Sequence, residues 1–116
     1  HINGYSLVAN LRFKNLILFC GNSNDPSIKK NLEKLKKFDL IFIDGDHSYD
    51  AVKNDFKLSL NLSHKKTVYI FHDICHAESG SKKFWGELKK IKKYRLKEII
   101  SRNHNFKYGT GILTLK

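Results

Sequence analysis

The most constraining feature of this sequence is the run Leu40-Ile41-Phe42-Ile43, which is apolar at every position and is followed directly by the polar segment 44–47. A strand with one wet face alternates apolar and polar residues, whereas a parallel strand between two layers of helices is apolar throughout. The run therefore predicts a parallel strand of an α/β fold, with both of its faces covered.

Strand and helix patterns alternate along the rest of the chain. Short apolar runs predict further strands at residues 16–20, 67–71, about 96–101 and 111–115, with a loop at Tyr108-Gly109-Thr110-Gly111 before the last one. Helical spacing predicts helices from Pro26, capped by Asp25, to Lys37, from Ser48 to about Leu62, and from Gly80 onward. This alternation predicts an α/β sandwich around a mostly parallel sheet, as one domain over residues 1–116.

Each predicted helix has a set of residues expected to point inward. In chain order these sets are Ile28, Leu32 and Leu35; Val52, Phe56 and Leu60; and Phe84, Trp85, Leu88 and Ile91.

Composition excludes several protein classes. No apolar stretch approaches the roughly 20 residues that a membrane-spanning helix needs, and no secretory signal pattern is present. The two cysteines, Cys20 and Cys75, are far apart and lack CxxC spacing, so we interpret both as small core residues in a cytoplasmic protein.

The net charge of +11 raises the alternative of a basic, non-catalytic module that binds nucleic acid or other anions. However, 19 of the 22 basic residues are lysine, whereas phosphate recognition favours the forked guanidinium of arginine. We therefore favour a solvated lysine surface and expect neither nucleic acid nor a membrane as a partner.

Polar residues gather where the predicted strands end, which is where α/β sheets bind ligands. Asp44 and Asp73 each follow an apolar strand and are expected to lie close enough to share a cation, for which Mg²⁺ or Mn²⁺ suits the oxygen ligands. His47 is well placed for general-base chemistry. The plainer alternative is that Asp44 and Asp46 only end a strand and cap the next helix.

Three segments carry a family resemblance: residues 38–49, which read FDLIFIDGDHSY; residues 71–74, which read FHDI; and residues 83–85, which read KFW. Over about residues 15–115 the chain resembles class I S-adenosylmethionine (SAM)-dependent methyltransferases of family 24, grouped around macrocin O-methyltransferase and the cephalosporin hydroxylase-type proteins. Catechol and caffeoyl-CoA O-methyltransferases are a more distant likeness.

The resemblance implies a Rossmann-like sheet with the parent strand order 3-2-1-4-5-7-6. This chain would supply only its C-terminal part, with strands resembling 3 to 7 and a terminal antiparallel hairpin. No glycine-rich loop for the methyl donor is present, so we expect the N-terminal, donor-binding half of the domain to lie upstream.

The resemblance also implies roles for individual residues. Asp44 and Asp73 would be metal ligands, with His72 as the candidate third ligand, and His47 would be the catalytic base. The positions expected to contact SAM are Asn22, Ser23, Asp44 and Asp46.

The implied function is a SAM-dependent O-methyltransferase, assisted by Mg²⁺ or Mn²⁺, acting on a small hydroxylated acceptor such as a sugar. For the oligomeric state, a homo-oligomer is one alternative. An alternative within the same fold is an iron-dependent hydroxylase, in which His47, His72 and either Asp73 or Asp44 hold the iron.

Overall fold

The computed structural model describes residue 17, residues 19–103 and residues 106–116, which fall into two compact units, His1–Lys34 and Leu35–Lys116. In the described part of the first unit, α2 (Pro26–Glu33) confirms the predicted helix, although it ends before Lys37. The Asp25 carboxylate accepts a hydrogen bond from the Ser27 amide at 3.0 Å and so caps the helix.

The strand predicted at residues 16–20 is not found. Ile17, Phe19 and Cys20 are not in a strand, Ile17 is 63% exposed, and residues 16 and 18 lie outside the described residues. A strand is stable only when a neighbouring strand satisfies its amides and carbonyls, and no described residue pairs with this run.

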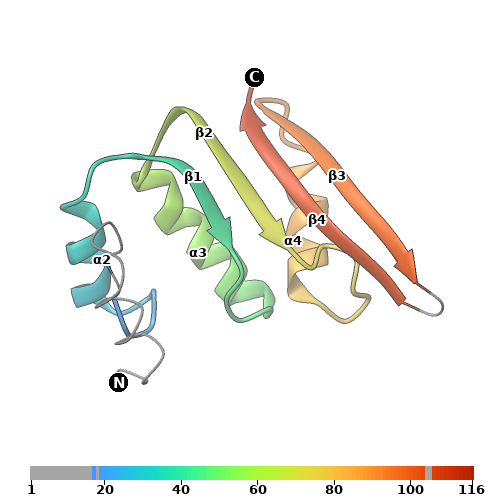
Figure 1. The fold of residues 1–116 in the computed structure, drawn as a ribbon, viewed down its shortest axis with the longest axis horizontal. Coiled ribbons are helices and arrows are strands. Elements are labelled where there is room, and N and C mark those ends of the chain that lie inside the picture. The colour runs from blue at the N-terminus through green and yellow to red at the C-terminus, as the bar shows by residue number, and fades with distance from the viewer. Residues whose placement is uncertain (1–16, 18, 104–105) are drawn as a thin grey trace. The chain divides into compact units, whose positions relative to one another are not determined.

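The second unit contains a four-stranded sheet of order β1-β2-β4-β3 (Figure 1). The strands are β1 (Phe38–Ile43), β2 (Ser63–His72), β3 (Tyr94–Asn103) and β4 (Phe106–Leu115). β1 is parallel to β2, and β4 runs antiparallel to both β2 and β3. This is the 4-5-7-6 part of the predicted sheet, including its antiparallel hairpin.

The helices α3 (Tyr49–Asn61) and α4 (Gly80–Leu88) pack against one face of this sheet. The core between them includes Phe56 of α3, Trp85 of α4 and Phe71 of β2, all at most 4% exposed. Burial of each such side chain stabilises the fold by about 2–3 kcal/mol. The core therefore anchors both helices whose first turns face the strand ends.

Two residues predicted to point inward do not. Leu60 is 41% exposed because it lies eight residues after Val52, which turns it about 80° away, whereas Ser59 at seven residues is buried. Ile91 is 40% exposed because α4 ends at Leu88 and the chain then turns.

The opposite face of β1 differs from the prediction. Leu40 and Phe42 are 57% and 54% exposed, while Ile43 on the helix side is buried. The parallel pairing of β1 is confirmed, but within the described part of the second unit helices cover only one face, since α3 and α4 share it.

The loop predicted at residues 108–111 is also wrong, because these residues belong to β4. A Cβ atom on Gly111 would lie 2.5 Å from the Trp85 ring, and one on Gly109 would lie 2.3 Å from Cys75 Sγ. The two glycines therefore serve close packing within a strand rather than a turn.

Among the described residues, no helix is both long and apolar enough to cross a membrane.

Candidate functional site

The candidate site lies at the carboxyl ends of β1 and β2, where these adjacent parallel strands finish at the same edge of the sheet. Asp44 directly follows β1, His72 is the last residue of β2, and Asp73 comes next. His47 lies in the short segment between β1 and α3. Four side chains are thus brought together from two segments of the chain, residues 44–47 after β1 and residues 72–73 at the end of β2.

Asp44 is the meeting point of two imidazoles. Its Oδ1 atom lies 2.9 Å from His72 Nδ1 and 3.3 Å from His47 Nε2. One ligand atom from each of these three residues lies within 4.8 Å of the others. This is a spacing at which a single divalent cation could be shared.

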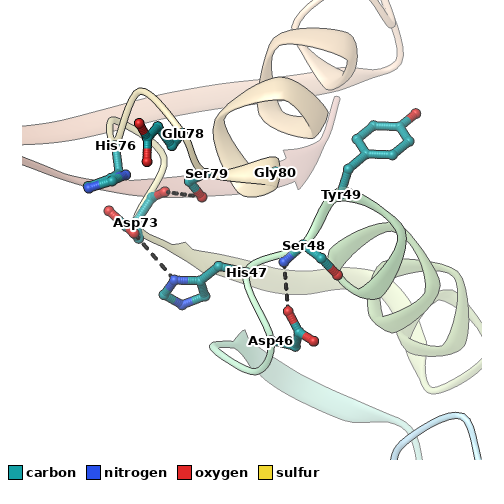
Figure 2. Close-up of a pocket in the computed structure, with 9 residues that line it drawn as sticks. All are labelled: Asp46, His47, Ser48, Tyr49, Asp73, His76, Glu78, Ser79 and Gly80. Atoms are coloured by element: carbon teal, nitrogen blue, oxygen red, sulfur yellow. Dashed lines mark hydrogen bonds and ion pairs between the residues drawn. The ribbon is translucent and has the colours of Figure 1, made fainter.

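Asp73 joins the cluster through His47. Its Oδ2 atom lies 3.3 Å from His47 Nδ1, so the two ring nitrogens of His47 face two different carboxylates (Figure 2 draws the Asp73 contact). A carboxylate on Nδ1 fixes the ring orientation and leaves Nε2 on the side of Asp44. Asp73 is also the least exposed of the four side chains, at 21%.

The backbone at Asp73 is unusual. Its φ angle of 57° lies in the left-handed region, and it is the one non-glycine residue with positive φ among those described. Aspartate tolerates this conformation better than most residues, and such local conformations recur at functional sites. The turn sends the chain away from β2 at once and brings the Asp73 carboxylate to His47.

The segment before α3 is fixed by capping interactions. The Asp46 carboxylate accepts from the Ser48 amide at 2.8 Å, and the Ser48 hydroxyl accepts from the Ala51 amide at 3.3 Å. Ser48 is therefore the N-cap of α3, while Asp46 closes a turn just before it instead of capping the helix, and Figure 2 shows the Asp46 side chain directed to Ser48 rather than to His47.

Gly80 joins the start of α4 to the same segment. Its amide donates to the His47 carbonyl at 2.9 Å, and a Cβ at this position would lie 1.9 Å from the Tyr49 nitrogen. Only glycine allows this approach. The backbone of His47 is thereby held between α3 and α4.

A cavity of about 710 Å³ opens beside His47 (Figure 2). It is lined by Asp46, His47, Ser48 and Tyr49 before and at the start of α3, by Asp73, His76, Glu78 and Ser79 after β2, and by Gly80. Its wall is rich in carboxylate, hydroxyl and imidazole groups that can hydrogen-bond a polar ligand.

Tyr49, at one side of this cavity, connects the two helices. Its hydroxyl donates to the Glu87 carboxylate at 2.8 Å and accepts from Lys53 Nζ at 3.3 Å. The hydrogen bond to Tyr49 raises the pKa of Lys53 above its usual value.

The predicted SAM-contacting residues divide between the two units. Asp44 and Asp46 are at the site, whereas Asn22 and Ser23 belong to the first unit. There, the Asn22 side chain accepts from the Asn24 amide at 2.9 Å, which closes a local turn.

Sequence patterns missed the contribution of the segment before α4. His76, Glu78, Ser79 and Gly80 all line the cavity, and the Ser79 amide and hydroxyl bind the carbonyls of His76 and Asp73. The Ser79-Gly80 pair before a helical pattern was a capping signal, but nothing in the sequence placed it against His47.

Comparisons with known proteins agree with this fold. A family model described as a methyltransferase domain matches residues 6–74. No curated protein matches the chain in a sequence search.

Solved O-methyltransferases share the architecture. One from Bacillus cereus, in complex with SAH, is 19% identical and superimposes with a TM-score of 0.60 over 78% of this chain and 46% of its own. TomG from Streptomyces achromogenes, involved in tomaymycin synthesis and in complex with SAM, is 17% identical, with a TM-score of 0.59 over 77% and 45%. The chain thus spans less than half the length of these structures. Because the family model covers more than half of its residues, the chain belongs to the methyltransferase-domain family.

Proposed function

We propose that this chain provides the metal- and acceptor-binding part of a SAM-dependent O-methyltransferase of the macrocin type, acting on a small hydroxylated molecule such as a sugar. The observation that carries the proposal is the convergence of Asp44, His47, His72 and Asp73 at one edge of the sheet, in a chain of the methyltransferase-domain family.

The donor groups fit a divalent cation. Asp44 offers a carboxylate oxygen and His72 an imidazole nitrogen within one cluster, and Asp73 adds a second carboxylate beside His47. We propose that Asp44, Asp73 and His72 hold the ion. When bound, a divalent cation acts as a Lewis acid that lowers the pKa of the acceptor hydroxyl.

His47 is proposed to accept the proton of that hydroxyl. With Asp73 at Nδ1, the Nε2 atom is the proposed proton acceptor, and because it lies 3.3 Å from Asp44 Oδ1 the acceptor hydroxyl would have to approach it beside Asp44. As the acceptor O–H bond breaks, an O–CH₃ bond forms and the S–CH₃ bond of the sulfonium donor breaks, which leaves a neutral thioether. The donor thus loses its positive charge, and His47 gains one with the proton that it accepts.

The cavity beside His47 is the proposed acceptor site. Asp73, Glu78 and Ser79 line it with oxygens that accept hydrogen bonds from hydroxyl groups. A sugar presents several hydroxyls at once and would be oriented by such a wall, with one hydroxyl next to His47. Asn22, Ser23, Asp44 and Asp46 remain our predicted contacts to SAM.

The first test is calorimetric titration of Mn²⁺ into the chain and into two matched variants. We expect one ion per chain, and we expect Asp44→Asn to weaken binding by about 100-fold because a carboxylate ligand is replaced by a neutral amide. Asp39→Asn is the control, since Asp39 pairs with a histidine at the opposite end of the same two strands. Absence of binding to a folded chain, or equal binding by the two variants, would contradict metal assistance.

Asp73→Asn and His47→Gln extend this series. Asp73→Asn should also weaken Mn²⁺ binding, because Asp73 is a proposed ligand. His47→Gln should keep the ion but lose methyl transfer from labelled SAM to a panel of glycosides and catechols, when both parent and variant are assayed with the donor-binding half of the domain present. Methyl transfer that persists in His47→Gln would rule out His47 as the base.

A second candidate function is favoured by one observation. Asp44, His47 and His72 form a set of two imidazoles and one carboxylate, which is the ligand set of non-haem iron oxygenases. Loss of metal binding in His47→Gln together with iron-dependent oxygen consumption would support this hydroxylase-like function over methyl transfer.

A further inference from the structure

His72 gives the proposed metal site a nitrogen donor from the sheet itself. It is the last residue of β2, its Nδ1 atom is 2.9 Å from Asp44 Oδ1, and its side chain is 48% exposed. The Phe42 ring packs nearly perpendicular to it, with 6.4 Å between centroids, and the centroid of the His47 ring lies 5.5 Å away. The imidazole is therefore held against Asp44 while it stays accessible to an ion from solvent.

Nitrogen and oxygen donors favour different ions. Mg²⁺ prefers oxygen ligands in a strict octahedron and gives up its water reluctantly. Imidazole suits first-row transition metals, whose affinity for a given site rises from Mn²⁺ through Co²⁺. One imidazole in place of a carboxylate therefore lowers affinity for Mg²⁺ more than affinity for Co²⁺ or Zn²⁺.

We propose that this site selects a first-row transition metal over Mg²⁺ and that His72 is the residue that sets this selectivity. The proposal rests on the proposed function, because it assumes that the cluster holds a divalent cation. It narrows the sequence-based expectation of Mg²⁺ or Mn²⁺ to an ion that accepts nitrogen.

The selectivity holds for either role of His47. If His47 is the base, the ligand set contains one imidazole and two carboxylates. If His47 is itself a ligand, as the 4.8 Å cluster allows, the set contains two imidazoles and the selectivity is stronger. In both cases His72 contributes the nitrogen.

The test is a set of calorimetric titrations of the chain with Mg²⁺, Mn²⁺, Co²⁺ and Zn²⁺. We expect Mn²⁺ to bind about tenfold or more tightly than Mg²⁺, and Co²⁺ and Zn²⁺ to bind more tightly still. The visible absorption of bound Co²⁺ should change when His72 is replaced, because it reports directly on the ligands of the ion.

His72→Glu provides the decisive variant, since it replaces the imidazole by an oxygen donor at the same strand end. We expect the ratio of Co²⁺ to Mg²⁺ affinity to fall by about 100-fold. His64→Gln is the matched control, because His64 also lies on β2 and pairs with an aspartate, but at the other end of the strand. It should leave the ratio unchanged.

Three outcomes are distinguishable. Equal affinity for Mg²⁺ and Co²⁺ in the parent chain, or an unchanged ratio in His72→Glu, overturns the selectivity proposal while metal assistance survives. No binding of any ion to a folded chain overturns the proposed function instead. If circular dichroism finds His72→Glu unfolded, His72→Asn supplies an amide oxygen without added charge and must shift the ratio in the same direction.

Discussion

The two ends of the β1–β2 pair each hold histidine–aspartate contacts, yet they are built differently. At the amino end of β2, His64 Nε2 lies 2.6 Å from Asp39 Oδ1, and its other ring nitrogen accepts from the Lys66 amide. Both ring nitrogens thus have partners close to this strand end. At the carboxyl end, two imidazoles converge on one carboxylate, and a second carboxylate, that of Asp73, faces one of these imidazoles. An isolated exposed ion pair contributes little to stability. A candidate site is therefore distinguished by the convergence of several side chains and not by a single histidine–aspartate pair.

The backbone is also less regular at the carboxyl end than at the amino end. The carboxyl end has the positive φ of Asp73 and the close approach of Gly80 to Tyr49. The amino end is closed by ordinary hydrogen bonds, in which the buried Thr67 hydroxyl donates to the Phe38 carbonyl at 2.6 Å and accepts from the His64 amide at 2.8 Å. Unusual backbone conformations are thus found at the strand end where several side chains must be oriented toward one another.

The largest effect on stability is expected from Gly80→Ala, which disrupts the close backbone packing at the carboxyl end. The added Cβ would lie 1.9 Å from the Tyr49 nitrogen, so the start of α4 must move away from His47. We expect a loss of about 3 kcal/mol in the free energy of unfolding. Urea denaturation followed by fluorescence of the single tryptophan, Trp85, measures it in the second unit.

Gly86→Ala is the matched control for this prediction. Gly86 lies in the same helix, and a Cβ there would meet nothing within 4 Å. Alanine should stabilise the helix by up to about 1 kcal/mol. Equal effects of the two substitutions would mean that the contact of α4 with the His47 segment is not tight.

The next effect concerns the amino end. Thr67→Val keeps the shape of a side chain that is 1% exposed but removes both hydrogen bonds of its hydroxyl. We expect a loss of about 1–2 kcal/mol in unfolding free energy, with unchanged Mn²⁺ affinity in calorimetry. A weakened Mn²⁺ site in a stably folded variant would contradict the separation of the two ends.

The sequence predicted the members of the cluster because the physical rule behind it is simple. Asp44 and Asp73 each follow an apolar strand, and parallel neighbours end at one edge, so their approach to a common histidine follows from the pattern. The pattern predicted a strand only at residues 67–71, whereas the structure extends β2 back to Ser63 and pairs His64 with Asp39. Residues 63–66 are all polar, so the apolar pattern from which strands were predicted could not identify this end of β2.

Glycine was one source of error in the fold. Gly109 and Gly111 favoured a loop because glycine usually marks a turn, and only the positions of Cys75 and of the Trp85 ring explain why the strand needs a glycine at each position. The close approach of Gly80 to Tyr49 was missed for the same reason. A glycine in the sequence shows that the backbone is unrestricted at that position. It does not show which atoms from elsewhere in the fold leave no room for a side chain there.

A smaller effect is expected at Asp73, where backbone and side chain can be separated. Asp73→Ala places a Cβ-bearing residue without a polar side chain in the left-handed region and should cost about 1 kcal/mol of stability. Asp73→Asn should cost less, because asparagine tolerates this conformation. Thermal denaturation of both variants measures the difference, and equal stability would mean that the left-handed turn carries no strain.

The smallest effect is expected from an ion pair away from both ends. Glu98 of β3 pairs with Lys89 and accepts from Trp85 Nε1 at 2.9 Å, and these contacts hold the pKa of Glu98 below its usual value, Lys89 contributing most. A carboxyl with a lowered pKa stabilises the fold above its unfolded pKa near 4.5, and that contribution is lost as pH falls through the lower folded value. Because Glu98 is partly exposed, solvent screening limits the contribution to about 1 kcal/mol or less. Glu98→Gln should therefore be less stable than the parent in urea denaturation at pH 7, and the difference should shrink as the pH falls below 4.5. A difference that persists at acid pH would assign the effect to packing around Trp85 instead of charge.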